Sequence, residues 1–173
     1  GRWSGDVKLR HRFDIETRMA GALNTRTMRS VRPLYIPPLK TDHTESGSLI
    51  MRDGSTAAIR PAEPSDATMM QQFVDRLSPE SRRHRYFSES SPSSDSIAAL
   101  CHSSNPRSQF TLIVTRVWES TSRIIAAGSY WARDEQTAEV AMAVDDGFHG
   151  KGLGTLLLER LALIAIRHSF THL

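Results

Sequence analysis

Glycine occupies three alternate positions, Gly150, Gly152 and Gly154, in the short segment from His149 to Thr155. The segment lies between a run of strand-forming residues and a long apolar run that favours a helix. Because glycine has no Cβ atom, the backbone here can turn tightly and approach a ligand closely. The helix that follows begins with unpaired N–H groups and the positive end of its dipole. This combination indicates an anion site, most naturally for a phosphate or a pyrophosphate.

Two widespread phosphate-binding motifs do not fit this segment. In a Walker loop Gly-Lys is followed by Ser or Thr, but here Gly152 follows Gly150-Lys151. A dinucleotide fingerprint needs a glycine where the sequence has Thr155. A glycine-rich turn that binds no ligand would look the same, and the loop alone leaves that alternative open.

The sequence predicts most of the elements that must hold this loop in place. Asp53-Gly54 marks a two-residue turn between two short strand-forming runs. A break at Pro61–Asp66 introduces a helix, with Asp66 as its N-cap. The further elements are a short basic helix at Ser81–Phe87, strands at Phe110–Trp118, Arg123–Trp131 and Thr137–Val144, and a helix from about Thr155 to Arg167. Strands joined by short polar turns predict an antiparallel meander, which argues against a dinucleotide-binding βαβ unit.

Charge is unevenly distributed along the 173 residues. Residues 1–50 hold nine basic and five acidic side chains, whereas residues 51–173 hold thirteen and fourteen. The N-terminal segment has no sustained apolar period, so residues 1–48 are interpreted as a basic, proline-containing tail or linker. The alternative is an arm that contacts an acidic partner or nucleic acid. Residues 49–173 form the predicted domain, whose nearly neutral balance gives no electrostatic reason to expect nucleic acid as a partner.

Composition also restricts the setting of the protein. No apolar run approaches the ~18–20 residues that cross a bilayer, so no membrane partner is predicted. Cys101 is the single cysteine, which rules out an internal disulfide and favours a reducing, cytoplasmic setting. Cys101-His102 has no second Cys or His at metal-binding spacing, so no metal site is predicted.

The glycine segment resembles the acyl-CoA loop of the GNAT acetyltransferase superfamily, which reads Gln/Arg-x-x-Gly-x-Gly/Ala. It aligns as His149 to Gly154, with His149 where the family usually has Gln or Arg. The resemblance extends over about residues 49–170 and includes Leu77–Ser81 and Ala138–Asp146. In detail it is similar to the GNAT domain fused to acyl-CoA synthetase-like domains in bacterial protein lysine acetyltransferases.

This resemblance implies an α/β (α+β) GNAT fold with a mixed, mostly antiparallel sheet flanked by helices. It implies acetyl-CoA as the acyl donor, no metal, and a protein substrate with an acceptor lysine. A fused or partner acyl-CoA synthetase domain is a further expectation. The residues that it places against the CoA are Met142, Ala143, Val144, His149, Gly150, Lys151, Gly152, Leu153, Gly154 and Thr155.

Glu139 is the candidate for the chemical step. On a strand, whose side chains alternate between two faces, it shares a face with Ala141 and Ala143, small residues that leave room for an acyl group and an amine. Carboxylates at this strand position act as the general base in lysine-acetylating relatives, which is the role that the resemblance implies. The alternative is a solvated strand residue, because the sequence does not show which way the side chain faces.

Other titratable residues have weaker claims to a catalytic role. His84 lies in the basic run of residues 82–85, interpreted as the solvated face of a short helix. The resemblance places this region beside the acceptor site, which leaves a role in recognising an acidic surface open. Asp145 and Asp146 would repel a pyrophosphate, so they are expected to cap or position the loop.

GNAT domains normally continue after the last helix found here with a strand, a helix and a final strand, whereas only Phe170–Leu173 remain. We therefore expect a chain truncated before its C-terminal strands, without an assignable acid for the leaving thiolate. The leading interpretation is an N-acetyltransferase that moves an acetyl group from acetyl-CoA directly to a protein lysine. The alternative is a non-catalytic acyl-CoA-sensing domain that regulates a larger enzyme.

Overall fold

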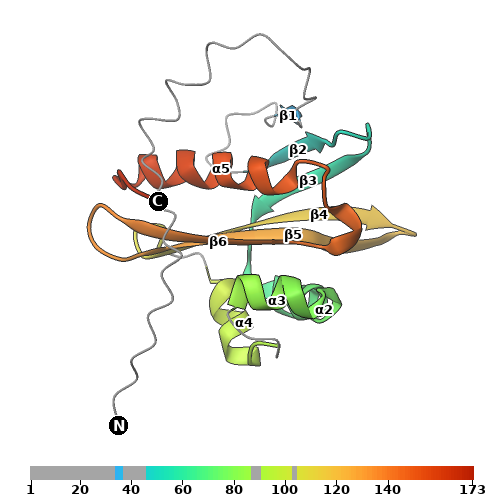
Figure 1. The fold of residues 1–173 in the computed structure, drawn as a ribbon, viewed down its shortest axis with the longest axis horizontal. Coiled ribbons are helices and arrows are strands. Elements are labelled where there is room, and N and C mark those ends of the chain that lie inside the picture. The colour runs from blue at the N-terminus through green and yellow to red at the C-terminus, as the bar shows by residue number, and fades with distance from the viewer. Residues whose placement is uncertain (1–33, 37–45, 87–90, 103–104) are drawn as a thin grey trace.

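The computed structural model describes residues 34–36, 46–86, 91–102 and 105–173. Figure 1 labels the elements along the chain. The strands are β1 (Leu34–Ile36), β2 (Gly47–Ile50), β3 (Thr56–Pro61), β4 (Gln109–Trp118), β5 (Thr121–Ala132) and β6 (Ala138–Val144). The helices are α2 (Ala67–Arg76), α3 (Pro79–Tyr86), α4 (Ser94–Leu100) and α5 (Leu153–Arg167), with 3₁₀ turns η1 (Pro64–Asp66) and η2 (Asp146–Phe148).

The strands form one sheet in the order β1-β2-β3-β4-β5-β6, and each pair of neighbours is antiparallel. The tightest connection joins β4 to β5, where Glu119 and Ser120 take φ values of 47° and 67°. Positive φ at both positions gives the turn a twist that matches the twist of antiparallel strands. One parallel bridge pairs Thr137 with His172 beside the start of β6. The predicted antiparallel meander is therefore confirmed, whereas the predicted mixed sheet is not, because parallel pairing among the described residues is limited to this one bridge outside the named strands.

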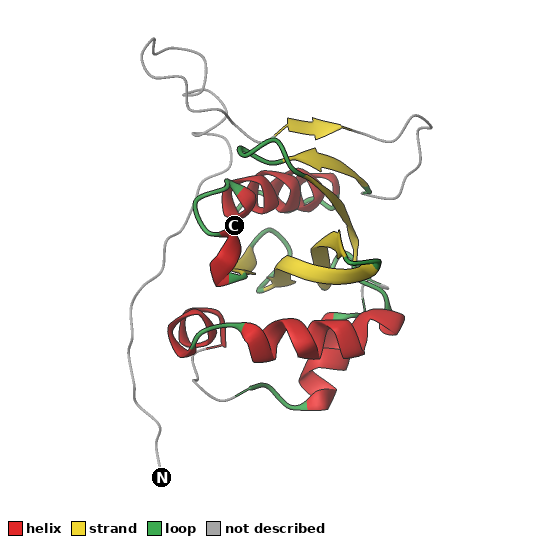
Figure 2. Ribbon diagram, turned by 90° about the vertical axis from the view of Figure 1, so that its right-hand side faces the viewer, coloured by secondary structure: helices red, strands yellow, loops and turns green. Residues whose placement is uncertain are grey.

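Helices cover both faces of this sheet, as Figures 1 and 2 show. Helix α5 lies on one face, and α2, α3 and α4 lie on the other. Strand β5 contributes to both halves of the core: Ile125 and Tyr130 pack on the α5 side, whereas Ile124 and Ala127 pack on the α2 and α4 side. The end of β6 and the start of α5 therefore meet at one edge of a rigid, two-sided core.

Helix α5 packs closely on the sheet because β5 carries a glycine below it. A Cβ atom at Gly128 would lie 2.9 Å from Leu161 Cδ1, closer than side chains tolerate. Leu157 and Leu161 are fully buried at this contact. As its mostly apolar composition predicts, α5 is held by burial along much of its circumference, and this fixes the position of its N-terminus.

The link between β3 and α2 differs from the prediction in one detail. Asp66 precedes α2, but its side chain does not cap that helix. The buried carboxylate instead accepts hydrogen bonds of 2.7 and 2.6 Å from the two Nη atoms of Arg60, and one from the Glu63 N–H. A buried carboxylate needs such paired donors more than a partly exposed helix end does. Asp66 therefore anchors the end of β3 to the start of α2.

The N-terminal boundary of the domain also differs from the prediction. The sequence predicts a tail over residues 1–48, but β2 begins at Gly47 and pairs with β1, residues Leu34–Ile36. Leu49 in β2 is fully buried in the core. Strands this short show too few alternations to reveal a period. The rest of the predicted tail, residues 1–33 and 37–45, lies outside the described residues.

In the part of the chain that the structure describes, no helix combines the length and the apolar character needed to span a membrane.

Candidate active site

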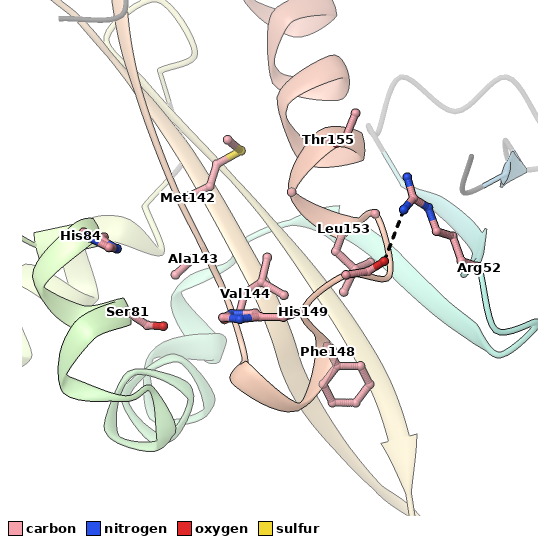
Figure 3. Close-up of a pocket in the computed structure, with 13 residues that line it drawn as sticks. Arg52, Ser81, His84, Met142, Ala143, Val144, Phe148, His149, Leu153 and Thr155 are labelled. Carbon is pink, nitrogen blue, oxygen red and sulfur yellow. Dashed lines mark hydrogen bonds between the residues drawn. The ribbon is translucent and has the colours of Figure 1, made fainter. Parts of the chain in front are cut away.

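A cavity of about 490 Å³ opens where the end of β6 faces the start of α5 and the first turns of α3 (Figure 3). Its walls are formed by Arg52, Ser81, His84, Met142, Ala143, Val144, Phe148, His149, Gly150, Gly152, Leu153, Gly154 and Thr155. Of the ten residues predicted to contact CoA, nine line this cavity and Lys151 does not. The fold therefore brings the predicted set together at a single open site.

The glycines give the loop its shape. Gly150 and Gly152 have φ values of 72° and 86°, in the left-handed region that other residues rarely adopt. Gly152 is the N-cap of α5, and the Leu156 N–H is the first to bond back to its carbonyl. The N–H groups of residues 153–155 therefore have no carbonyl partner within the helix. A Cβ atom at Gly154 would meet nothing within 4 Å, so the start of α5 is open to a ligand.

Two aspartates anchor the loop, as the sequence predicts. Asp145 Oδ1 accepts a hydrogen bond from the Gly147 N–H at 3.1 Å and so caps η2. Asp146 reaches α3: its carboxylate accepts from the Ser78 N–H and from the hydroxyls of Ser78 and Ser81, at 2.9 to 3.0 Å. These hydrogen bonds, the Ser78 N–H first, lower the pKa of Asp146. Asp146 thus fixes α3 against the loop and sets the width of the cavity.

His149 is turned back toward β6. Its Nε2 lies 2.9 Å from the Val144 carbonyl oxygen and 3.9 Å from Asp146 Oδ1. Because a carbonyl oxygen only accepts hydrogen bonds, Nε2 must carry the proton and donate. The imidazole ring therefore braces the corner between β6 and the loop while it lines the cavity.

The β2–β3 turn holds the loop from the other side. Lys151 Nζ lies 2.7 Å from Asp53 Oδ2, and this hydrogen bond, together with those from Ser55, holds the pKa of Asp53 well below its usual value. The neighbouring Arg52 lines the cavity, and its Nη1 donates to the Gly150 carbonyl oxygen at 3.4 Å (Figure 3). Arg52 was not predicted as a site residue, because no local pattern in the sequence connects it to a loop 98 residues away.

Glu139 lies beside the cavity and does not line it. The pairing of β5 with β6 sets Glu139 opposite Trp131 and Ala141 opposite Ser129, and strand alternation puts Glu139, Ala141 and Ala143 on one face. Glu139 is 45% exposed and forms an ion pair with Arg133. Along the strand it is about 7 Å from Ala141. A carboxylate at this place can reach a group bound over Ala141 directly or through one water molecule.

Helix α3 forms the wall of the cavity that faces the loop. Ser81 and His84 line the cavity, and His84 is exposed, as the predicted solvated face requires. Arg85 contradicts that prediction, because it is buried against β5. Four consecutive residues extend around the whole circumference of a helix. A helix that packs on a sheet must therefore turn at least one residue of such a run toward the sheet.

A family model described as the acetyltransferase (GNAT) family matches residues 71–173, more than half of the chain. The chain therefore belongs to the GNAT acetyltransferase family. Its relatives include Acetyltransferase PA5475 of Pseudomonas aeruginosa, which is 26% identical over 119 residues. The match covers 68% of this chain and 64% of that protein, so the chain spans less than two thirds of the length of this curated relative.

Solved structures with the same fold include the GNAT domain of S. lividans PAT, with a TM-score of 0.65 and 25% identity over 73% of this chain and 74% of that one. Another is yncA from Salmonella typhimurium, solved with its cofactor acetyl-CoA, with a TM-score of 0.50. It is 19% identical over 67% of this chain and 66% of that one. The GNAT fold predicted from the sequence is thereby confirmed.

Proposed function

We propose that this chain transfers an acetyl group from acetyl-CoA to the side-chain amine of a protein lysine. The observation that carries the proposal is the open start of α5, where three N–H groups without a carbonyl partner in the helix and the glycine loop face a cavity in a member of the GNAT family. Such a helix terminus favours a pyrophosphate. The likeness to the GNAT domain of S. lividans PAT supports the lysine acceptor that the sequence resemblance implies.

The donor fits the cavity as an extended ligand. The pyrophosphate would lie on the N–H groups of residues 153–155, with the Arg52 guanidinium beside it as a further donor. Among the described strands β6 is the last in the sheet order, and the backbone groups along its outer edge could bond the amides of the pantetheine arm as an added strand would. The thioester would then lie near Ala141 and Ala143, where small side chains leave room.

Glu139 is proposed as the general base. At pH 7 only about one lysine in a few thousand carries the neutral amine, because its pKa is ~10.4. Glu139 would accept the ammonium proton directly or through water, and the amine nitrogen would attack the carbonyl carbon of the thioester. The carbon–sulfur bond then breaks and releases the CoA thiolate, the attacking nitrogen loses its second proton to give the acetamide, and the thiolate takes up one proton from solvent or the protein. The contact of Glu139 with Arg133 would have to open or be shared when the acceptor binds.

The test is the Glu139→Gln variant of the full-length gene product, which keeps the side-chain shape and removes its basicity. The expected result is a kcat about 10²-fold lower, or more, if the base acts directly, with unchanged CoA affinity in calorimetry. The rate should recover at high pH, where the lysine loses its proton unaided. A Glu139→Gln rate within a factor of two of wild type at neutral pH would refute this role of Glu139.

A second function is a non-catalytic acyl-CoA sensor, and the position of Glu139 outside the cavity favours it. A sensor would bind acetyl-CoA and turn over no amine. Calorimetry that shows binding, combined with no acetylation of lysine peptides by the full-length gene product at any pH, would decide for the sensor. Absence of CoA binding would refute both functions.

A further inference from the structure

Arg85 is a buried cation on the helix that forms one wall of the cavity. Only 7% of its surface is exposed. Its Nη2 donates to Ser129 Oγ at 3.3 Å, and its Cζ lies 4.7 Å from the centre of the Tyr86 ring and 5.0 Å from that of Trp131. Among the described residues no carboxylate forms an ion pair with it. The charge is therefore stabilised by two aromatic faces and a hydroxyl, and no anion of the described residues neutralises it.

The register of the sheet places this charge beside the proposed acceptor site. Arg85 contacts Ser129 and Trp131 on β5, and these two residues pair with Ala141 and Glu139 on β6. All four lie on the face of the sheet that α3 covers. Paired Cβ atoms on neighbouring strands lie about 5 Å apart. A ligand atom over Ala141 would therefore be roughly 6–8 Å from the guanidinium.

We propose that Arg85 is an electrostatic residue of the acceptor site, which favours the neutral, nucleophilic form of the incoming lysine amine. The inference rests on the proposed function and adds a means of acceptor activation to it. A second positive charge near an ammonium group disfavours the protonated state of that group. At roughly 7 Å and the effective dielectric constant of about 20 that suits such pairs, the amine would titrate about one to two pH units lower.

The other titratable groups on this face leave the charge of Arg85 in place. Burial raises the pKa of the Tyr86 hydroxyl and raises that of the Cys101 thiol at the end of α4 to about 11, so both are neutral at physiological pH. Glu139 is the carboxylate on the β6 part of the face; its ion pair with Arg133 would open or be shared when the acceptor binds, and Glu139 would then accept the proton that Arg85 helps to displace from the amine. Burial also lowers the pKa of Arg85, but an arginine keeps its proton throughout the range in which lysine titrates.

Buried arginines also serve packing, and the pH dependence of the rate separates the two roles. If Arg85 only packs, its replacement would lower the rate by the same factor at every pH. If Arg85 favours the neutral amine, its replacement would lower the rate at low pH and leave the rate unchanged at high pH, where the amine is neutral in any case. Arg83 on the same helix offers a matched control, with the same loss of charge at an exposed position.

The experiment measures kcat for a lysine peptide between pH 6.5 and 10.5 with the wild-type full-length gene product, Arg85→Met and Arg83→Met. The expected result for Arg85→Met is a rate about ten-fold or more below wild type at pH 7 that converges with it at high pH, with CoA affinity unchanged. Arg83→Met should follow the wild-type profile. Equal loss at every pH for Arg85→Met, or the same loss in Arg83→Met, would overturn the inference.

The wild-type profile is a second test that does not depend on the folding of a variant. Its alkaline midpoint should lie at least one pH unit below that of the free peptide amine, and a midpoint equal to that of the free amine would overturn the inference. A wild type that binds acetyl-CoA but acetylates no peptide would overturn the proposed function, and the inference with it. An active wild type whose variants differ by a constant factor would overturn the inference alone.

Discussion

Replacing Gly154 with leucine should block the proposed phosphate site without destabilising the fold. Gly154 lies in the first turn of α5 with a helical backbone, and a Cβ atom there would meet nothing within 4 Å. Leucine favours helices over glycine by up to about 1 kcal/mol, so the free protein should be as stable as wild type or melt a few degrees higher. In the complex, the leucine side chain would project where the pyrophosphate is proposed to lie.

The expected loss of affinity follows from the hydrogen bonds that the side chain would block. A hydrogen bond to a charged group contributes about 1.5–3 kcal/mol, so loss of two would weaken CoA binding by about 10²-fold or more. Gly154→Ala is the matched control, since alanine stands at this position in the GNAT loop pattern, and it should bind CoA nearly as wild type does. Calorimetry gives the affinities, and thermal melting with and without CoA gives the stabilities.

Two outcomes would refute this reasoning. A Gly154→Leu variant with wild-type CoA affinity would show that the phosphates do not lie at the start of α5. A free variant that melts well below wild type would show that the space around Gly154 is filled in solution. Gly152 is a poorer choice for the same test, because its φ of 86° makes any side chain strained whether or not a ligand binds.

Asp66→Asn should lower the free energy of unfolding at pH 7 by about 1–3 kcal/mol, because it leaves the guanidinium of Arg60 without its anion. The pKa of Asp66 is lowered, first by the hydrogen bonds from Arg60. The contribution of Asp66 to the free energy of unfolding is therefore complete above its unfolded-state pKa of 3.8 and is lost as the pH falls through its folded-state pKa. Urea unfolding of both proteins should therefore converge in acid, and a gap independent of pH would contradict the assignment. A deletion of residues 1–50 should destabilise the domain by several kcal/mol, because it removes the fully buried Leu49. A deletion that ends at residue 33 should retain β1 and β2 and melt near the wild-type temperature. Equal melting temperatures for the two deletions would contradict the observed boundary.

Much of the fold was predictable because its signals are local. The predicted strands at residues 110–118, 123–131 and 137–144 agree with β4, β5 and β6 to within two residues at every end. Long strands and helices repeat their pattern of apolar residues several times, so the period survives local exceptions. The opposite holds for β1, which is too short to show a period and exists because it pairs with β2, and for the start of β2, of which only the run before the Asp53-Gly54 turn was predicted.

The proposed donor site was largely predictable for a related reason. The loop from His149 to Gly154 is contiguous, and its glycines act on the backbone where they stand. The same holds for the pattern of Glu139 and its two alanines, since alternation along one strand needs no knowledge of other strands. Lys151 is the exception in the loop, because its side chain turns to Asp53 and away from the cavity.

Residue types and short spacings were thus enough to locate the glycine loop proposed to bind phosphate, the meander and the face shared by Glu139, Ala141 and Ala143. Contacts between distant segments came only from the folded chain: Arg52 crosses 98 residues to reach the loop, and Asp146 fastens α3 to it. The burial of Arg85 belongs to the same class, since Arg83 and His84, which precede it on α3, are exposed and basic. A charged side chain can be buried only where other elements supply aromatic faces and hydroxyls around it, and those elements meet only when the sheet has formed.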